Sequence, residues 1–196
     1  MNWTAVLGAL TEGEDLDTGV AHDAMAAILA GEATSAQIAA FAIALRMKGE
    51  TVDELTGLLR AMVEAADPVV LDPSVDAIDT CGTGGDRSGT INISSIAAFV
   101  VAGAGVPVCK HGNRAASSQC GSADVYEALG VPIDLDPDTV GRAVTEVGMG
   151  FCFAQRFHAA LRHAGPTRKE LGVRTAFNFL GPMANPARVR RQVVGV

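Results

Sequence analysis

One stretch of the sequence, Asp79-Thr-Cys-Gly-Thr-Gly-Gly-Asp-Arg-Ser-Gly-Thr-Ile-Asn-Ile-Ser-Ser95, combines closely spaced glycines with a run of hydroxyl side chains. The apolar residues 75–78 before it predict a short strand, and the pattern of residues 94–101 predicts a helix. Glycines between a strand and a helix permit positive φ angles and let a ligand approach main-chain N–H groups at the helix N-terminus. The stretch therefore predicts an anion site, and phosphate is the anion that such a loop suits.

Two common phosphate-binding motifs do not account for this loop. A P-loop requires a Lys-Ser/Thr pair after its second glycine, and a Rossmann loop counted from Gly82 requires a third glycine where Arg87 stands. An ordinary strand-to-helix turn is the simpler alternative. The hydroxyl and amide side chains that frame and follow the glycines exceed what such a turn requires, so we favour a phosphate site of another kind.

Length and composition limit the class of protein. The chain has 196 residues, 48% of them hydrophobic, and a formal net charge of −7. Such a chain can bury one core or two small ones, and its acidic balance argues against a nucleic-acid partner. No apolar run reaches the length of a membrane span, and the start of the chain lacks the basic residues of a signal peptide. We therefore expect a cytoplasmic protein with no membrane partner.

The cysteines and histidines follow no disulfide or metal-binding pattern. Four cysteines are widely spaced and include no Cys-x-x-Cys pair: Cys81, Cys109, Cys120 and Cys152. The four histidines show no spacing typical of metal ligands. We therefore predict reduced, buried thiols rather than disulfides or zinc ligands.

The first third of the sequence, residues 2–66, predicts a small all-helical unit. Helix-capping signals recur along it: Asp17 or Thr18, Thr34 or Ser35, and Thr51 with Glu54 three residues later. Gly31 and Gly49 are predicted to end two of these helices. The simplest interpretation of this unit is a packing or oligomerisation element without chemistry.

From residue 75 onward, short apolar runs alternate with helical segments, which predicts a largely parallel sheet flanked by helices. The predicted strands are 75–78, 106–109, 149–153 and 193–196. The predicted helices are 94–102, 123–129 and 137–147. Ligands bind beyond the carboxyl ends of parallel strands, and both the loop after Gly82 and the polar segment 110–118 fall there.

The segment 110–118 supplies the positive charge that the glycine loop lacks. Lys110, Arg114, Ser117 and Ser118 offer charged and hydroxyl donors to a polyphosphate. The alternative interpretation of this segment is a basic surface turn. Its position directly after a parallel strand favours the phosphate site over that alternative. His111 is either a ligand contact or a strand-end histidine bonded to the main chain, and the sequence does not separate the two.

A third polar segment, residues 168–187, carries an arginine suited to carboxylates. Gly172 and the pair Gly181-Pro182 are predicted to punctuate two short helices here. Arg168 would then reach from a helix as a bidentate carboxylate clamp. An exposed helix arginine is the alternative, and the residue pattern alone leaves both open.

Five segments together, 79–86, 92–95, 110–118, 121–124 and 168–187, resemble the motif set of the anthranilate phosphoribosyltransferase family, which performs the second step of tryptophan biosynthesis. The resemblance implies an α/β fold of the nucleoside phosphorylase and phosphoribosyltransferase type, with a small N-terminal helical domain and a largely parallel sheet flanked by helices. The implied domains are 1–70, with 166–187 packing on it, and an incomplete α/β domain over 74–165 and 188–196.

The resemblance also implies a reaction, in which anthranilate displaces pyrophosphate from phosphoribosyl pyrophosphate with Mg²⁺ present. The implied donor-binding residues are Gly82, Gly85, Asp86, Thr90, Asn92, Ile93, Ser94, Ser95, Lys110, His111, Gly112, Asn113, Arg114, Ala115, Ala116, Ser117, Ser118 and Ser122. Gly82, Asn113 and Arg168 would bind anthranilate, and Ser94 would also bind magnesium. An aromatic amine is neutral at pH 7, so no acid–base residue is expected, and the protein chiefly orients the reactants and stabilises the leaving pyrophosphate. A homodimer through the helical domain is likewise implied.

The sequence departs from the family pattern in two respects. Gln155 and Ala159 stand where the family usually has prolines, in a segment that borders the anthranilate entrance. The chain also stops at Val196, before the Asp-Glu pair that supplies the family's second magnesium site. We therefore expect this chain by itself to be inactive or weakly active.

Three alternative functions compete with this one. A pyrimidine nucleoside phosphorylase shares the architecture, but its glycine loop reads differently and it lacks segment 168–187 in this form. A catalytically silent relative that binds nucleic acid conflicts with the intact loop and the acidic balance. The third alternative is a purely structural fragment.

Overall fold

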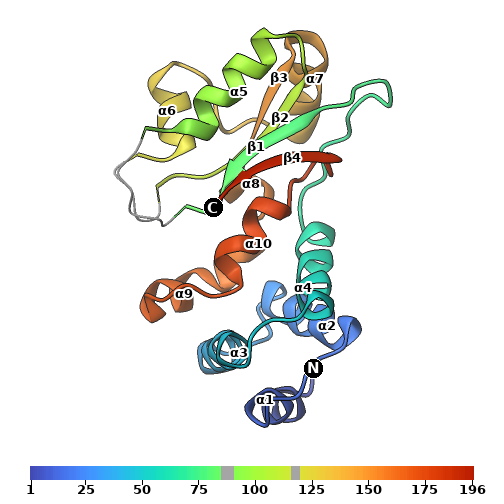
Figure 1. Cartoon of the computed structure of the whole chain (residues 1–196), viewed down its shortest axis with the longest axis vertical. Coiled ribbons are helices and arrows are strands. Elements are labelled where there is room, and N and C mark those ends of the chain that lie inside the picture. Colours follow the sequence, from blue (N-terminus) through green and yellow to red (C-terminus); the bar gives the residue numbers. More distant parts are fainter. Residues whose placement is uncertain (85–90, 116–119) are drawn as a thin grey trace. The chain divides into compact units, whose positions relative to one another are not determined.

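The computed structural model describes residues 1–84, 91–115 and 120–196 (Figure 1). They form two compact units: a helical unit of residues 1–66 and 158–184, and a sheet unit of residues 67–157 and 185–196. The sequence-based division had assigned 158–165 to the sheet and 185–187 to the helices. Tertiary hydrogen bonds explain the difference, because His158 Nε2 bonds Ala184 O within the helical unit and Val69 N bonds Pro186 O within the sheet unit.

The helical unit contains α1 (Trp3–Thr11), α2 (Thr18–Leu29), α3 (Ser35–Lys48), α4 (Val52–Glu64), the 3₁₀ helix η1 (Ala159–His163), α9 (Gly165–Leu171) and α10 (Phe177–Met183). The predicted caps are confirmed. Asp17 Oδ1 accepts a hydrogen bond from Val20 N at 2.8 Å, and capping boxes form at Thr34 and at Thr51.

The predicted break at Gly181-Pro182 is wrong, because both residues lie inside α10. Only one residue of that helix follows the proline, so its missing N–H disrupts little.

Close helix packing forms the core of the helical unit. Met25 and Ile28 of α2, Phe41 of α3 and Leu58 of α4 are buried in one apolar cluster. Gly57 lies where α2 and α4 meet, and a Cβ atom there would lie 2.3 Å from Thr18 O. The two helices approach this closely because the position has no side chain.

Glu54 and Lys48 form a buried ion pair in the same unit. Glu54 Oε2 accepts from Lys48 Nζ at 3.0 Å and from Thr51 N at 2.8 Å, while Oε1 accepts from Leu16 N at 3.0 Å. Burial by itself raises the pKa of Glu54, but these donors outweigh it and leave that pKa below its ordinary value. Burial lowers the pKa of Lys48, yet Asp15 and Glu54 raise it above the usual range. Both groups are therefore held in their charged forms.

The sheet unit contains β1 (Ile78–Gly82), α5 (Ile93–Gly103), β2 (Val108–Gly112), α6 (Ser122–Ala128), α7 (Pro137–Val147), β3 (Met149–Phe153), α8 (Ala154–Phe157) and β4 (Arg191–Gly195). The strand order is β3-β2-β1-β4, and every neighbouring pair is parallel. The predicted parallel sheet is thus confirmed, and α7 and β3 have the predicted bounds.

The predicted bounds of the other three strands are wrong. β2 runs to Gly112, so Lys110 and His111 lie within the strand rather than after it, and β4 begins at Arg191 rather than at residue 193. β1 begins at Ile78, where the predicted strand ended, and runs through Asp79 and Thr80 to Gly82. Val75 and Ala77 pack into an apolar cluster without joining the sheet. Polar residues can occupy the strand because their side chains find hydrogen-bond partners on neighbouring elements.

Helices cover both faces of the sheet, as the alternation along β3 shows. Phe151 and Phe153 point towards α6, where Phe151 packs on Tyr126, whereas a Cβ atom on Gly150 would contact Val140 and Val144 of α7.

Cys81, Cys109 and Cys152 are buried as predicted, and burial raises the pKa of Cys81 to about 12. Cys120 is exposed, contrary to the prediction, because it lies in a loop before α6. None of the four forms a disulfide, and no described helix is long and apolar enough to cross a membrane.

Candidate functional site

The parallel register places the carboxyl ends of β1 and β2 at one edge of the sheet, beside the N-terminus of α5. Gly82 ends β1 and Gly112 ends β2. Asn92 is the N-cap of α5, and within the described residues no side chain caps this end. Ile93 N donates to Ile91 O and Ser95 N to Asn92 O, so the positive end of the α5 dipole, rather than a set of unpaired N–H groups, is what favours an anion at this edge.

Lys110 of β2 is completely buried beneath the first turn of α5. Its ammonium donates to Thr80 O and to Ser94 Oγ, the latter at 3.3 Å. Thr80 Oγ1 in turn donates to Ser94 O at 2.8 Å, which ties the helix start to β1. Burial lowers the pKa of Lys110, and the nearby Asp79 carboxylate opposes that change. The Lys110 side chain therefore lies directly behind the N-terminal turn of α5.

Asp79 ties β1 to β2, to β4 and to the segment before β4. Its carboxylate accepts from His111 N at 3.0 Å, Asn185 Nδ2 at 2.9 Å and Gln192 Nε2 at 3.1 Å. Burial raises the pKa of Asp79 despite these donors. Sequence reasoning did not include Asp79 or Asn185 among the site residues. The available signal for Asp79 was its charge at the start of the glycine-rich stretch. Asn185 lies 106 positions away, and no local pattern linked it to Asp79.

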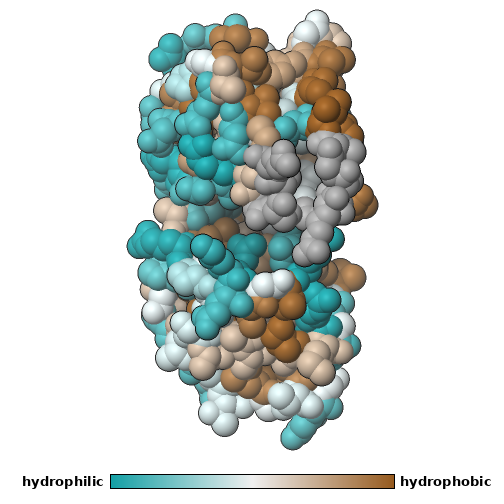
Figure 2. All heavy atoms as spheres, turned by 90° about the vertical axis from the view of Figure 1, so that its left-hand side faces the viewer, coloured by the Kyte–Doolittle hydropathy of each residue, from teal (hydrophilic) through white to brown (hydrophobic). Residues whose placement is uncertain are grey.

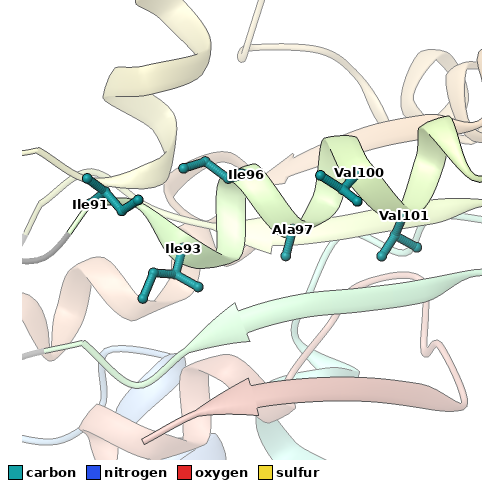
Figure 3. A pocket seen from close by; sticks show the side chains of 6 residues that line it. All are labelled: Ile91, Ile93, Ile96, Ala97, Val100 and Val101. Atoms are coloured by element: carbon teal, nitrogen blue, oxygen red, sulfur yellow. The ribbon is translucent and has the colours of Figure 1, made fainter.

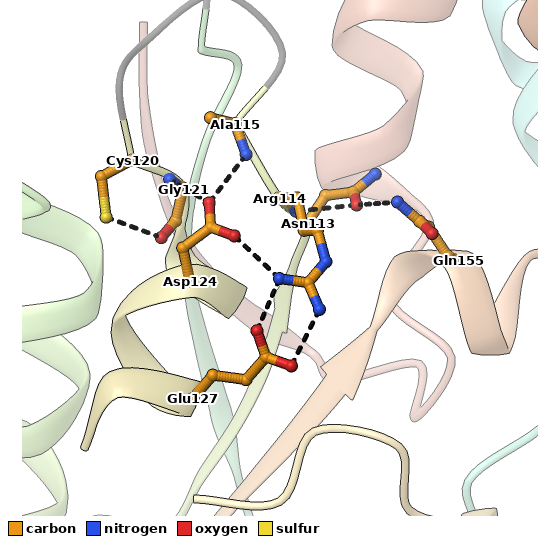
Figure 4. A network of polar contacts seen from close by, with 8 residues as sticks. All are labelled: Asn113, Arg114, Ala115, Cys120, Gly121, Asp124, Glu127 and Gln155. Atoms are coloured by element: carbon orange, nitrogen blue, oxygen red, sulfur yellow. Dashed lines mark hydrogen bonds and ion pairs between the residues drawn. The ribbon is translucent and has the colours of Figure 1, made fainter. Parts of the chain in front are cut away.

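The segment after β2 is held by side chains of α6 and β3 (Figure 4). Arg114 Nη1 donates to Asp124 at 2.9 Å and to Glu127 at 2.6 Å, Nη2 donates to Glu127 at 2.8 Å, and the guanidinium lies over the Phe153 ring. These carboxylates raise the pKa of Arg114. The Arg114 side chain is thus occupied by protein groups, and its contact with a donor substrate stays a prediction.

The structure brings many of the predicted donor-binding residues to this one edge. They are Gly82, Asn92, Ile93, Ser94, Ser95, Lys110, His111, Gly112, Asn113, Arg114, Ala115 and Ser122. Gly112 and Ser122 are in close contact, since a Cβ atom on Gly112 would lie 3.0 Å from Ser122 Cβ. Six further predicted residues lie outside the described residues: Gly85, Asp86, Thr90, Ala116, Ser117 and Ser118.

Arg168, the predicted carboxylate clamp, belongs to the helical unit and lies on α9. Its Nη2 donates to Phe177 O at 3.3 Å, and its guanidinium lies over the Phe177 ring at 5.6 Å from the centroid. Burial lowers the pKa of Arg168. Gly82 and Asn113 belong to the sheet unit, so the meeting of these three residues on one anthranilate molecule stays a prediction.

The outer side of α5 is apolar. Hydrophobic side chains gather over this helix in Figure 2, and Figure 3 shows the six that line a shallow pocket: Ile91, Ile93, Ile96, Ala97, Val100 and Val101. None of them offers a hydrogen-bond donor from its side chain. The side chains of this pocket therefore offer an anion no hydrogen bond.

A magnesium ion would find one suitable protein oxygen among the implied ligands, the half-buried Ser94 Oγ in the first turn of α5. In the described part of the chain no three His, Cys, Asp or Glu side chains cluster as metal ligands. Magnesium commonly keeps few protein ligands and binds substrate phosphate oxygens and water. The residues present fit an ion that is held mainly by the substrate.

Comparison with known proteins agrees with this geometry. The model of the glycosyl transferase family helical bundle domain matches residues 4–66, and that of the glycosyl transferase family a/b domain matches residues 74–196. The anthranilate phosphoribosyltransferase of Salinispora arenicola is 58% identical over 195 residues, covering 98% of this chain and 55% of the relative. That of Thermomicrobium roseum is 59% identical over 192 residues, with the same coverage of both chains.

Solved structures show the same similarity. The crystal structure of anthranilate phosphoribosyltransferase from Thermus thermophilus matches with a TM-score of 0.92 and 47% identity, over 97% of this chain and 58% of that one. The Saccharomyces cerevisiae enzyme in complex with PRPP and Mg matches with a TM-score of 0.89 and 29% identity, over 99% and 58%. The chain spans about half the length of the curated relatives, covering 55% of the first of them. This chain belongs to the glycosyl transferase family defined by that helical bundle and α/β domain, and its sequence is similar to those of the anthranilate phosphoribosyltransferases.

Proposed function

We propose that this chain takes part in the transfer of the phosphoribosyl group of phosphoribosyl pyrophosphate to the amine of anthranilate, in tryptophan biosynthesis. The observation that supports this most is the edge of the sheet at β1 and β2, where the uncapped N-terminus of α5 and the buried Lys110 ammonium both favour an anion. The relatives are named for this activity.

In this proposal the phosphates of the donor bind at the first turn of α5, near Ser94 and Ser95. When bound with the donor, magnesium neutralises part of the charge on the departing pyrophosphate. Arg168 suits the anthranilate carboxylate because a guanidinium pairs with a carboxylate bidentately, and the resemblance also assigns Asn113 to this substrate. The neutral aromatic amine attacks C1 of the ribose without a strong base, so the protein acts by orientation and electrostatic stabilisation.

The direct test is an assay of the purified protein with anthranilate, phosphoribosyl pyrophosphate and magnesium. We expect the fluorescence of anthranilate to fall as it is consumed, and no fall when the donor is omitted. A nucleoside with inorganic phosphate, offered to the same protein, tests phosphorylase activity. Unchanged anthranilate fluorescence with the complete mixture, together with no binding of phosphoribosyl pyrophosphate in titration calorimetry, would contradict the proposal.

We propose further that the protein acts in the cytoplasm as a homodimer through its helical unit. The homodimer rests on the resemblance to the family, and the location rests on the lack of an apolar run long enough to span a membrane. Analytical ultracentrifugation of the chain, compared with a variant bearing a charge at Met47, an exposed residue of the helical unit, tests the dimer. A monomer at micromolar concentration would contradict it.

A further inference from the structure

The side chain of Asn113 meets that of Gln155 at the carboxyl edge of the sheet. Asn113 directly follows β2, and Gln155 is the second residue of α8, which directly follows β3. The register pairs Gly112 with Phe153, so the two strands end level with each other. Gln155 Nε2 lies 3.4 Å from Asn113 Oδ1, and Figure 4 shows the two carboxamides pointing towards one another.

A second donor identifies which atom of the Asn113 carboxamide is the oxygen. The main-chain N–H of Arg114 donates to Asn113 Oδ1 at 2.8 Å. A main-chain N–H can only donate, so the atom facing it must be the acceptor. Gln155 therefore also presents its donor, Nε2, to the same oxygen. An amide oxygen has two lone pairs, and these two contacts use both, which leaves Nδ2 as the group offered elsewhere.

The Arg114 contact is itself held in place by ion pairs. The guanidinium of Arg114 is bound to Asp124 and Glu127 of α6, and Asp124 Oδ2 accepts from Ala115 N at 3.2 Å. On the other side of Arg114, Asn113 O accepts from Ala123 N of α6 at 3.2 Å, so the main chain on both sides of Arg114 is fixed to α6. Gln155 supplies the other contact to Asn113 Oδ1, and both residues are exposed, so solvent and solutes reach this pair.

We propose that Gln155 is a positioning residue for the acceptor substrate. Together with the Arg114 N–H it holds the Asn113 carboxamide so that Nδ2 donates to the carboxylate of an aromatic amino acid, here an aminobenzoate. This inference rests on the proposed function. It deepens that function, because it makes the orientation of one amide the determinant of acceptor affinity.

Steady-state kinetics of the purified protein tests the inference with two variants. Gln155→Leu keeps the size of the side chain and removes the donor. We expect the KM for anthranilate to rise about three- to tenfold, as for one lost neutral hydrogen bond, with kcat and the KM for the donor within about twofold of their original values. Gln155→Glu places a charged acceptor against Asn113 Oδ1 and near an anionic substrate, so its effect on the anthranilate KM should be larger.

A double-mutant cycle with Asn113→Ala separates positioning from other roles. If Gln155 acts through Asn113, Gln155→Leu has no further effect on the anthranilate KM in the Asn113→Ala background. An equal effect in both backgrounds overturns the inference, as does a Gln155→Leu protein whose kcat and both KM values move together. If the unsubstituted protein neither binds nor consumes anthranilate, the proposed function fails and this inference with it. If the protein turns over anthranilate and Gln155→Leu leaves the anthranilate KM unchanged, the inference is overturned and the proposed function stands.

Discussion

The two units each bury a lysine near a carboxylate, and the two arrangements are opposite in their electrostatics. In the helical unit, Lys48 and Glu54 lie 3.0 Å apart, and the pKa of each is moved towards its charged form. In the sheet unit, burial raises the pKa of Asp79 and lowers that of Lys110, so both are moved towards their neutral forms. The first arrangement compensates its charges and the second does not.

The partners explain this difference. Lys48 contacts two carboxylates, Asp15 and Glu54, whereas the ammonium of Lys110 contacts a carbonyl and a hydroxyl. Asp79 directs its oxygens at neutral donors instead of at Lys110. Uncompensated buried charge is costly and is concentrated at functional sites. An anionic ligand at the N-terminus of α5 would supply the negative charge that Lys110 lacks, whereas the pair in the helical unit needs none.

The largest expected effect comes from removing each lysine in turn. Lys110→Met should weaken the binding of phosphoribosyl pyrophosphate by about 1.5–3 kcal/mol, the value of a hydrogen bond to a charged group. Lys48→Met is the matched control: it should lower the free energy of unfolding by about 3 kcal/mol, because it leaves Glu54 buried without its cation, and should leave donor affinity unchanged. Titration calorimetry and urea unfolding measure the two quantities. Equal loss of donor affinity in both variants would contradict the assignment of donor binding to Lys110 and of a purely stabilising role to Lys48.

The packing of the helical unit predicts the next effect. Gly57→Ala should lower the free energy of unfolding by about 1–3 kcal/mol, because the added methyl group would collide with Thr18 O and the two helices must move apart. Gly8→Ala is the matched control, since a Cβ atom on this residue of α1 meets nothing within 4 Å. That change should raise the free energy of unfolding by about 0.5–1 kcal/mol. Urea unfolding that shows the same sign for both variants would refute the packing argument.

Arg168 tests whether the helical unit contributes chemistry as well as packing. Arg168→Ala should raise the KM for anthranilate by about tenfold, or about 1.4 kcal/mol, with a smaller change in the donor KM. Arg168→Lys keeps the charge but loses the planar fork and the position over the Phe177 ring, so it should not restore the KM. Steady-state kinetics with each substrate varied in turn provides the measurement. A change confined to the donor KM would exclude the assignment.

The smallest effect concerns the pH dependence of stability. The pKa of Glu54 is lower in the folded protein than in the unfolded chain, so its stabilising effect is complete above the unfolded value of about 4.3 and is lost as the pH falls through the folded value. Glu54→Gln should therefore flatten the acid side of the stability curve. Chemical unfolding at pH 3 to 6 measures this. An unchanged acid slope would show that the ion pair contributes no pH-dependent stability.

The sequence by itself determined the features whose partners lie a few residues apart. Asp17, Thr34 and Thr51 cap their helices through bonds that span three positions, so the capping pattern was visible in the sequence. The alternation of short apolar runs with helical segments likewise predicted the parallel sheet, because a parallel connection needs a crossover. The glycines of the stretch that begins at Asp79 predict an anion site for the same local reason, and that site stays a prediction.

Only the tertiary structure decided the features whose partners are distant in the chain. The strand runs through Asp79 because Asn185, 106 positions later, satisfies its carboxylate. Gln155 meets the side chain of Asn113, 42 positions earlier, because β2 and β3 end level. Such contacts depend on strand register and on which side chains face each other across the sheet. Those relations arise when the chain folds, and no spacing within a short segment encodes them.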